Sequence, residues 1–341
     1  MTGRERVLAV LSGRQPDHRP FMPITMMFAA DVLGVKYLQC IRDHKTMADA
    51  QIKTAEMFGL DHVSAIAPTS EAVDLGARFQ WFDDQPPGII EQEALLTDKA
   101  DLARLPSPGS VLGASMEERV RGVEWLRQRV ESELIVEGWV EGPCSDAADL
   151  RGMNRLMVDF SDDPAFVEQL FNYSVELAVG FAAAQIQAGA DIIGIGDPPA
   201  SLVGPRMYKS QVWPWQKKLV DAIHARGAKV RLHICGNTRR ILASMGELGC
   251  DLVDIDSPVP FEQARAQMGP LQALIGNLDP VRDVCNSSSE SIRQSLEALQ
   301  QKAGERWVVG AGCEIVRDTP HENMRAMMLF AQSHTAEIVA A

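Results

Sequence analysis

Two residues that commonly bind metal ions lie close together in a short apolar segment of the chain. His233 and Cys235 occur in the sequence VRLHICGN, residues 230–237. The segment predicts a β-strand, and residues two apart on a strand share a face because successive side chains alternate. An imidazole nitrogen and a thiolate on one face can bind a tetrahedral zinc ion, with a third protein ligand from elsewhere in the chain.

Cys313 is the candidate for that third ligand. It lies in GAGCEI, at the end of another predicted strand, and in a β/α barrel it would stand at the height of His233 and Cys235. Three protein ligands with an exchangeable fourth are typical of a catalytic zinc site. The candidates for the fourth position and for catalytic carboxylates end other predicted strands: Glu141, Asp197 and Asp256. The sequence does not choose among them, and Asp197 is also a candidate to orient the ring of His233.

A packing role is the alternative for these residues, because a buried histidine beside a buried cysteine is common in protein cores. The remaining cysteines favour that role more strongly. Cys40, Cys250 and Cys285 lie in helical or loop contexts without a partner at ligand spacing, which predicts small core residues. Cys144 follows a predicted strand and could lie near the site.

Eight short apolar runs, alternating with helix-like segments, would position these side chains. The runs cover residues 19–25, 62–68, 134–143, 191–198, 230–236, 251–258, 272–280 and 307–315. Most are rich in Val, Ile and Leu, and several end in Gly, Asp or Pro, as buried parallel strands do. Helices are predicted between them at residues 164–188, 209–226, 238–248 and 289–302. This rhythm favours an α/β fold, a (β/α)8 TIM barrel, over an open sheet with the same local pattern.

Two segments depart from the barrel rhythm within a chain that we expect to form one domain, residues 1–341. Residues 1–12 predict a helix that caps the bottom of the barrel. Residues 69–133 are too long for one βα unit and predict an insertion between the second and third strands. It contains a hairpin of residues 77–81 and 88–93 and a helix at residues 116–130. We expect this insertion to cover part of the active-site face.

Composition excludes several classes of protein. The 341 residues include 33 Lys and Arg against 46 Asp and Glu, a net charge of −13. Such an acidic chain is a poor candidate for binding nucleic acid or an anionic membrane surface, since both need a positive field. Neither a signal-peptide core nor a membrane span of ~18 apolar residues is visible. Six cysteines are too few for a disulfide scaffold, so we expect a cytoplasmic protein with reduced thiols.

Seven motifs spread along the chain carry a family resemblance. They are ERVLAVLSGRQPDHRP, EAVDLGARFQWFDDQPPG, EGP, GDPPASLVGPRMY, HICGNT, IGNLDP and GAGCEI. With them the chain resembles the uroporphyrinogen-decarboxylase superfamily, specifically its zinc-dependent branch of corrinoid methyltransferases, which includes the methylcobamide:coenzyme M methyltransferases. The zinc ligands of that branch fall on His233, Cys235 and Cys313.

The resemblance implies a reaction and its partners. A methyl group would move between a corrinoid and a small thiol, a methyl ether or a related methylated compound. The chain has no Asp-x-His-x-x-Gly signature of a corrinoid-binding module, so the corrinoid would arrive on a separate protein that docks over the barrel mouth. A homodimer is compatible with this barrel family, although no helix face in the sequence marks an interface.

Two alternatives stay open at this stage. The parent decarboxylases carry an Arg-Gln-Ala-Gly-Arg-Tyr segment after the first strand, where this chain has Ile-Thr-Met-Met-Phe-Ala at residues 24–29. A substrate with eight carboxylates needs fixed cations, preferably arginines, and the uncharged segment argues against decarboxylation. The second alternative is a barrel without activity that serves as a zinc-dependent binding partner.

Several residues near predicted strand ends are candidates for contacts with the substrate. Met26, Met27 and Phe28 are expected to form an apolar wall beside the corrinoid or the substrate, or else a hydrophobic plug in the barrel mouth. Asn237 and Asp279 follow strand ends and could orient a ligand or cap a turn.

Arg206 and Tyr208 follow the fourth predicted strand. They could contact an anionic tail of the substrate, or they could belong to the surface of a helix.

Overall fold

A curled parallel sheet forms the centre of the computed structural model, which describes residues 1–110 and 112–333. In these described residues the sheet has seven strands in the order β1-β4-β5-β6-β7-β8-β9. The strands are β1 His62–Ser64, β4 Ile135–Glu141, β5 Ile192–Gly196, β6 Lys229–His233, β7 Leu252–Ile255, β8 Ala273–Gly276 and β9 Trp307–Val308. Every neighbouring pair is parallel, which confirms the α/β, TIM-barrel-like class.

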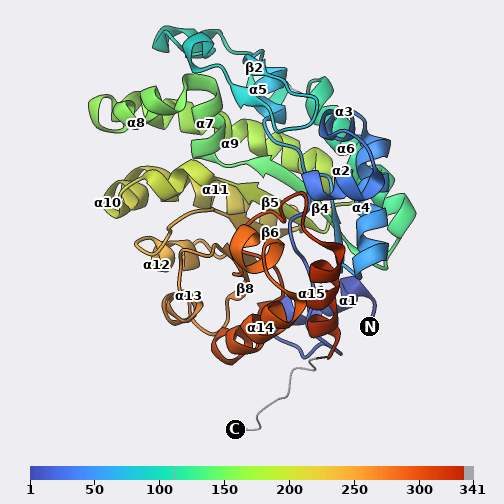
Figure 1. Cartoon of the computed structure of the whole chain (residues 1–341). Helices are drawn as coiled ribbons and strands as arrows, with labels where there is room; N and C mark the ends of the chain where they lie inside the picture. The colour runs from blue at the N-terminus through green and yellow to red at the C-terminus, as the bar shows by residue number, and fades with distance from the viewer. Residues whose placement is uncertain (111, 334–341) are drawn as a thin grey trace.

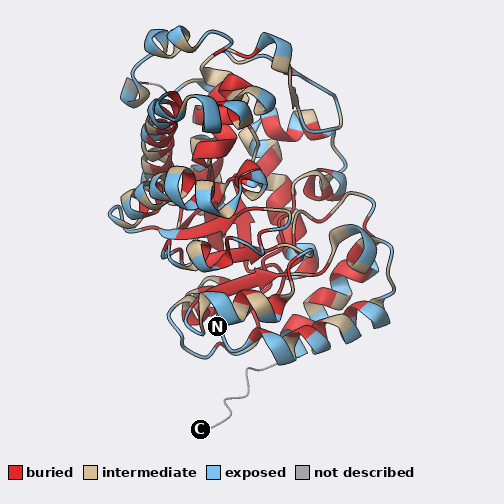
Figure 2. Cartoon of the chain, turned by 90° about the vertical axis from the view of Figure 1, so that its left-hand side faces the viewer, coloured by how far each residue is buried: buried red, intermediate tan, exposed pale blue. Residues whose placement is uncertain are grey.

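Helices surround the sheet, and most follow a strand (Figure 1). They are α1 Gly3–Leu11, α2 Met27–Leu33, α3 Tyr37–Arg42, α4 His44–Phe58, α5 Ser70–Asp74, α6 Ala114–Val130, α7 Pro143–Arg151, α8 Met153–Asp162, α9 Pro164–Gln187, α10 Pro205–Met207, α11 Trp213–His224, α12 Leu242–Gly246, α13 Phe261–Met268, α14 Ser289–Ala303 and α15 His321–Ser333. The predicted helices correspond to α9, α11, α12 and α14, of which α12 is shorter than expected. Their outer faces are exposed while the strands are buried (Figure 2).

The first predicted strand, residues 19–25, is present only as an isolated parallel bridge between Phe21 and Val309. The segment is irregular, although it lies between the two edges of the sheet. The backbone N–H of Met22 donates to the carbonyl of Val309 beside β9, and the carbonyl of Phe21 accepts from the N–H that precedes β1, both at 3.0 Å. Pro20 and Pro23 have no N–H to donate, so a continuous strand ladder cannot form here.

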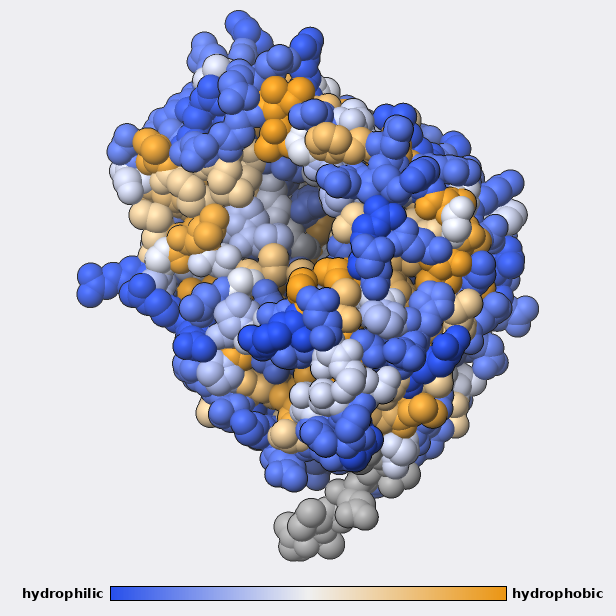
Figure 3. All heavy atoms as spheres, viewed as in Figure 1, coloured by the Kyte–Doolittle hydropathy of each residue, from blue (hydrophilic) through white to orange (hydrophobic). Residues whose placement is uncertain are grey.

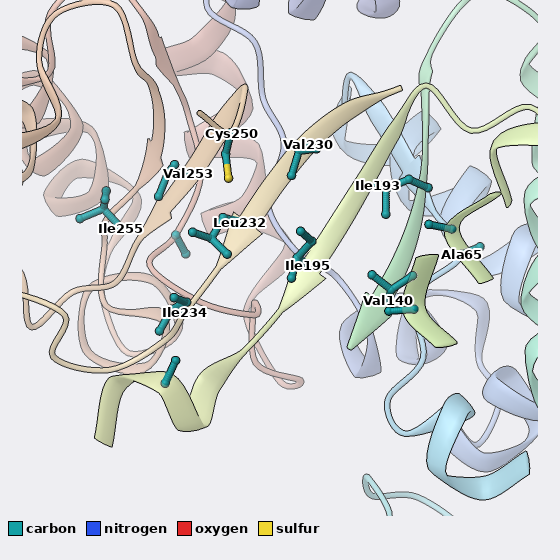
Figure 4. Close-up of a cluster of buried hydrophobic side chains, with 14 of the residues drawn as sticks. Ala65, Val140, Ile193, Ile195, Val230, Leu232, Ile234, Cys250, Val253 and Ile255 are labelled. Carbon is teal, nitrogen blue, oxygen red and sulfur yellow. The ribbon is translucent and has the colours of Figure 1, made fainter. Parts of the chain in front are cut away.

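Alternating side chains divide the sheet between two environments. One set, including Ile195 and Leu232, packs outward with the surrounding helices in the large core (Figure 4). The other set points inward. At the start of the strands the inward set includes Ile135 and Ile192, which pack with Val7 of α1. Helix α1 therefore caps the bottom of the sheet, as predicted, and the inward positions near the strand ends are left for polar residues.

The long segment between β1 and β4 contains the predicted hairpin and helix. Its elements are α5, the antiparallel pair β2 Phe79–Gln80 and β3 Gly88–Ile89, the 3-10 turns Glu91–Glu93, Lys99–Arg104 and Pro108–Ser110, and α6. Helix α6 packs against α4 and β4, so it serves as the crossover helix of an ordinary βα unit. The part of this segment that exceeds an ordinary βα unit therefore covers residues 69–110 and 112–113 of the described chain, a shorter stretch than expected.

No helix in the described residues combines the length and the hydropathy needed to cross a membrane.

Candidate metal centre and active-site cavity

Three side chains from the ends of β6 and β9 converge at one point. His233 is the last residue of β6, Cys235 follows two residues later, and Cys313 lies in the loop after β9. Their ligand atoms all lie within 4.8 Å of one another. The structure therefore brings together the three residues that the sequence proposed as metal ligands.

The spacing of these atoms suits a zinc ion. The Sγ of Cys313 lies 3.6 Å from Nε2 of His233. In a tetrahedral site with Zn–S of ~2.3 Å and Zn–N of ~2.05 Å, sulfur and nitrogen are separated by about 3.6 Å. One imidazole and two thiols are also a donor set that zinc prefers. The residues present therefore fit this metal, with one coordination position left for water or a substrate.

The ring of His233 is oriented by Asp254 of the neighbouring strand β7. Its Nδ1 lies 2.7 Å from Oδ2 of Asp254, so Nε2 is the nitrogen that faces Cys313. Burial opposes a charged imidazole, but the hydrogen bonds and charges of Asp254 and Cys313 together raise the pKa of His233 to about 10. A carboxylate behind a ligating histidine is a usual device for fixing the tautomer.

Asp254, rather than Asp197, is thus the partner of His233, and the expectation for Asp197 is wrong. Only the backbone N–H of Asp197 contacts this residue, by donating to its carbonyl oxygen. The carboxylate of Asp197 instead accepts from the N–H of Ser145 at 2.8 Å and from Gln216 at 2.7 Å. Asp197 is fully buried and does not line the cavity described below.

A buried ionic network holds the side chain of Asp254 in place. Arg231 donates from Nε to Asp254 at 3.0 Å and from Nη1 to Glu137 at 3.2 Å. Glu137 also accepts from the hydroxyl of Ser64 at 2.6 Å and pairs with His62. Although burial disfavours its charge, Arg231 and His62 hold the pKa of Glu137 below its ordinary value. Paired charges of this kind fix the inward side chains, since leaving one unpartnered would be costly.

The three ligand candidates share the wall of one cavity of about 220 Å³. Apolar side chains form part of the remaining wall, among them Ile24, Met26, Ile66 and Trp139. The face drawn in Figure 3 is hollowed near its centre, and hydrophobic and hydrophilic residues border the hollow. Met26 lies in the cavity wall, where it could contact a substrate, as the sequence suggested. The volume suits a small molecule.

Two carboxyl groups, those of Glu71 and Glu141, also line the cavity and lie close together. Glu141 ends β4, and Glu71 of α5 accepts a hydrogen bond from the N–H of Glu141 at 2.8 Å. Burial, together with Asp146 and Asp197, raises the pKa of Glu141 to about 7. Burial and the nearby Glu141 raise the pKa of Glu71 well above its ordinary value. Sequence reasoning missed Glu71 because it was assigned to the insertion that follows the second predicted strand.

The other predicted polar residues serve the backbone. Asp256 accepts from the N–H groups of Gly236 and Ser257, and so it caps the turn that carries Cys235. Among the described residues, no carboxylate completes the cluster of the three ligand atoms within 4.8 Å, so the structure assigns no fourth protein ligand. Asn237 is exposed and accepts from the N–H of Arg239.

Asp279 likewise caps a helical turn, Pro280–Cys285, by accepting from the N–H groups of Val281 and Arg282. Neither Asp279 nor Asn237 lines the cavity.

Phe28 lies in the core and not in the cavity wall. Its ring centroid is 5.6 Å from that of Phe58 and 6.0 Å from that of His321, and 2% of the residue is exposed. The expectation that it contacts a substrate is therefore not supported. It belongs to the inner face of α2, which an apolar run alone does not distinguish from a cavity wall.

The remaining candidates lie outside the cavity lining as well. Cys144 is fully buried in α7, and burial raises the pKa of its thiol. Tyr208 is also buried, and its hydroxyl donates to Gln216 at 2.6 Å. Arg206 is exposed in α10.

Comparisons with known proteins give the chain its relatives. The family description uroporphyrinogen decarboxylase (URO-D) matches residues 2–334. The methylcobamide:CoM methyltransferase MtbA of Methanosarcina mazei is 32% identical over 342 residues, 98% of each chain. The methylcobamide:CoM methyltransferase MtaA of Methanosarcina barkeri is 25% identical over 343 residues, 96% of each chain. A solved methyltransferase from Methanosarcina mazei shares the fold, with a TM-score of 0.82 and 22% identity over 98% of this chain and 99% of that one.

Proposed function

The chain belongs to the uroporphyrinogen decarboxylase family, and from this premise we propose that it is a zinc-dependent methyltransferase. It moves a methyl group between a corrinoid and a small thiol, methyl ether or related methylated compound. The observation that carries the proposal is the convergence of His233, Cys235 and Cys313 in the wall of a cavity. The methyltransferases that the chain resembles along nearly its whole length support the same reaction.

Each residue of the site has a distinct task in this reaction. His233, Cys235 and Cys313 would hold the zinc ion, and Asp254 keeps the imidazole in the tautomer that exposes Nε2. Zinc in such a site lowers the pKa of a bound thiol or polarises a methylated heteroatom. Glu141 lines the same cavity, and its pKa of about 7 suits it to hold the proton that a thiol loses. The positions of Asp197 and Asp256 do not support a catalytic task for them.

A separate corrinoid protein would dock on the loops at the strand ends. Four large apolar side chains are exposed in the loops named here: Leu202 after β5, Val281 after β8, and Trp81 and Phe82 in the hairpin between β1 and β4. Their exposed fractions are 67%, 51%, 37% and 38%. Exposed apolar side chains favour contact with another protein.

We also propose that residues 1–341 form a single domain, that the protein is cytoplasmic, as its sparse cysteines suggest, and that it forms a homodimer, as the family resemblance suggests.

The cavity does not favour the decarboxylase alternative. A substrate with eight carboxylates needs bound cations, and neither lysine nor arginine is among the described residues that line the cavity. Ile24 and Met26 instead contribute apolar wall where an arginine-rich segment would be needed. The cavity wall therefore favours methyl transfer at the metal cluster over decarboxylation.

A methyl-transfer assay tests the proposal. Zinc-loaded protein is incubated with methylcobalamin and a small thiol, and the loss of the methylcobalamin absorption band is followed. We expect turnover by the wild type and by Cys250→Ala, which alters a buried cysteine outside the cavity lining, and none by Cys313→Ala. Equal turnover in all three proteins would contradict the proposal. A folded, zinc-containing wild type that turns over no thiol or methyl ether would instead favour the inactive zinc-binding alternative.

A further inference from the structure

The charge of the cavity wall restricts what can bind there. Three carboxyl groups contribute to it: Glu71, Glu141 and Glu314. Among the described lining residues the basic side chain is His233, which faces Cys313 and Asp254. A ligand in this cavity therefore meets acidic groups and a metal site, without a lysine or arginine.

The arginines closest to this wall in the chain are engaged elsewhere. Arg231 lies against the ring of Trp139, 5.5 Å from its centroid, but its guanidinium is bonded to Glu137 and Asp254. It is 1% exposed. Turning it toward the cavity would take the guanidinium away from two buried carboxylates, which is strongly unfavourable.

Arg317, three residues beyond Glu314, is also engaged. It pairs with Asp31 and donates to the backbone carbonyl of Asp84 at 2.6 Å. It does not line the cavity.

One residue of the wall carries a hydrogen-bond donor that has no acceptor among the described residues. The indole Nε1 of Trp139 is buried and has no hydrogen-bond partner among the described residues. Trp139 lines the cavity and is 8% exposed. A buried donor without a partner is rare, and a hydroxyl or ether oxygen of a ligand could satisfy it.

We propose that the small molecule handled at this site is uncharged or positively charged away from its reacting sulfur or oxygen, and that anionic compounds are disfavoured. The inference rests on the proposed methyltransferase function and names its substrate class. An ammonium group in the cavity can donate hydrogen bonds to the carboxyl oxygens of Glu71 and Glu141 whether or not these groups are ionised, and a hydroxyl group gains polar contacts without repulsion. A sulfonate or carboxylate would meet the same carboxyl groups with no lysine or arginine in the lining to offset its charge.

Three thioethers that differ only in their head group test the proposal by binding alone. They are 2-(methylthio)ethylamine, 2-(methylthio)ethanol and 2-(methylthio)ethanesulfonate. Titration calorimetry with zinc-loaded protein at pH 8, above the pKa of about 7 of Glu141, gives a Kd for each. We expect the amine and the alcohol to bind about tenfold or more tightly than the sulfonate, because like charges in a partly buried site repel.

Two variants assign the effect to the carboxyl groups. The double variant Glu71→Gln/Glu141→Gln should reduce the difference between the Kd values of amine and sulfonate to about threefold, since the carboxyl groups are removed while the shape of the side chains is kept. Glu247→Gln removes a carboxylate that is exposed and does not line the cavity, and it should leave the difference between the Kd values of amine and sulfonate as in the wild type. Zinc content and thermal unfolding show that each variant is folded.

The outcomes separate this inference from the proposed function. The parent thiols of the three compounds are assayed with methylcobalamin in parallel. Tightest binding of the sulfonate, or binding of none of the thioethers, overturns the inference. If a thiol is still methylated in either case, the methyltransferase function stands. If no thiol is methylated and the protein holds no zinc, both fail.

Discussion

Asp254→Asn tests whether Asp254 orients the imidazole ring of His233 for metal binding. Asp254 accepts from Nδ1 of His233 at 2.7 Å and from Nε of Arg231 at 3.0 Å. Asparagine keeps the shape of the side chain but offers one neutral oxygen where the aspartate offers two charged ones. It cannot hold both the imidazole and the guanidinium, so His233 should lose the partner that fixes its tautomer.

The size of the effect follows from these contacts. Loss of a carboxylate behind a ligating histidine weakens metal binding by ~10- to 100-fold, equivalent to roughly 1.4–2.7 kcal/mol. The variant should also unfold more easily. Removing one partner of a buried ion pair costs ~3–5 kcal/mol, and we expect about 3 kcal/mol because Glu137 still pairs with Arg231.

Competition with a chromophoric zinc chelator measures the affinity, and urea denaturation of the zinc-free protein measures the stability. Asp251→Asn is the matched control: Asp251 also pairs with a histidine, His224, at 2.7 Å, but it stands at the opposite end of β7 from the metal cluster. We expect its zinc affinity to equal that of the wild type. A zinc affinity of Asp254→Asn within about twofold of the wild type would refute the orienting role.

Three further predictions concern acidity, packing and docking. The pKa of Glu141 is raised from 4.5 to about 7, so its effect on stability becomes unfavourable as pH rises between these values. Glu141→Gln should therefore raise the free energy of unfolding by ~1–3 kcal/mol at pH 8 and little at pH 4, which urea titrations at both pH values check; an equal change at both would argue against a raised pKa. Phe28→Ala should lower the free energy of unfolding by ~3–5 kcal/mol, measured by thermal or urea unfolding, and leave the zinc content unchanged, since the ring lies in the core. Loss of zinc without destabilisation would show that Phe28 supports the metal site instead. The double variant Leu202→Ser/Val281→Ser should raise the KM for a corrinoid protein more than the KM for free methylcobalamin. Equal changes in the two KM values would show that these side chains do not contact the corrinoid protein.

The sequence predicts those features that depend on the period of a single strand. His233 and Cys235 are two residues apart, so their shared face follows from strand geometry alone. Cys313 could be placed beside them because parallel strands in a barrel end at the same face. The first strand could not be predicted in the same way. Its apolar residues resemble a strand, but Pro20 and Pro23 remove the donors that a ladder needs.

Features that depend on lateral register were not accessible from the sequence. Asp254 and Asp197 both follow the pattern of polar residues near strand ends, and only the pairing of β6 with β7 places Asp254 beside His233. Glu71 reaches the cavity through the fold of the insertion, which has no periodic pattern to guide a prediction. Phe28 was expected in the cavity wall and lies in the core instead, because an apolar run in the sequence does not show which face of α2 packs inward.

The zinc content of the purified protein tests the central claim most directly. Protein prepared without chelators is analysed by inductively coupled plasma mass spectrometry, alongside Cys235→Ala and Cys250→Ala. The account predicts about one zinc ion per chain in the wild type and in Cys250→Ala, and loss of the metal in a folded Cys235→Ala. A folded wild type that holds no zinc even after zinc is added, or a Cys235→Ala variant that keeps it, would contradict the account.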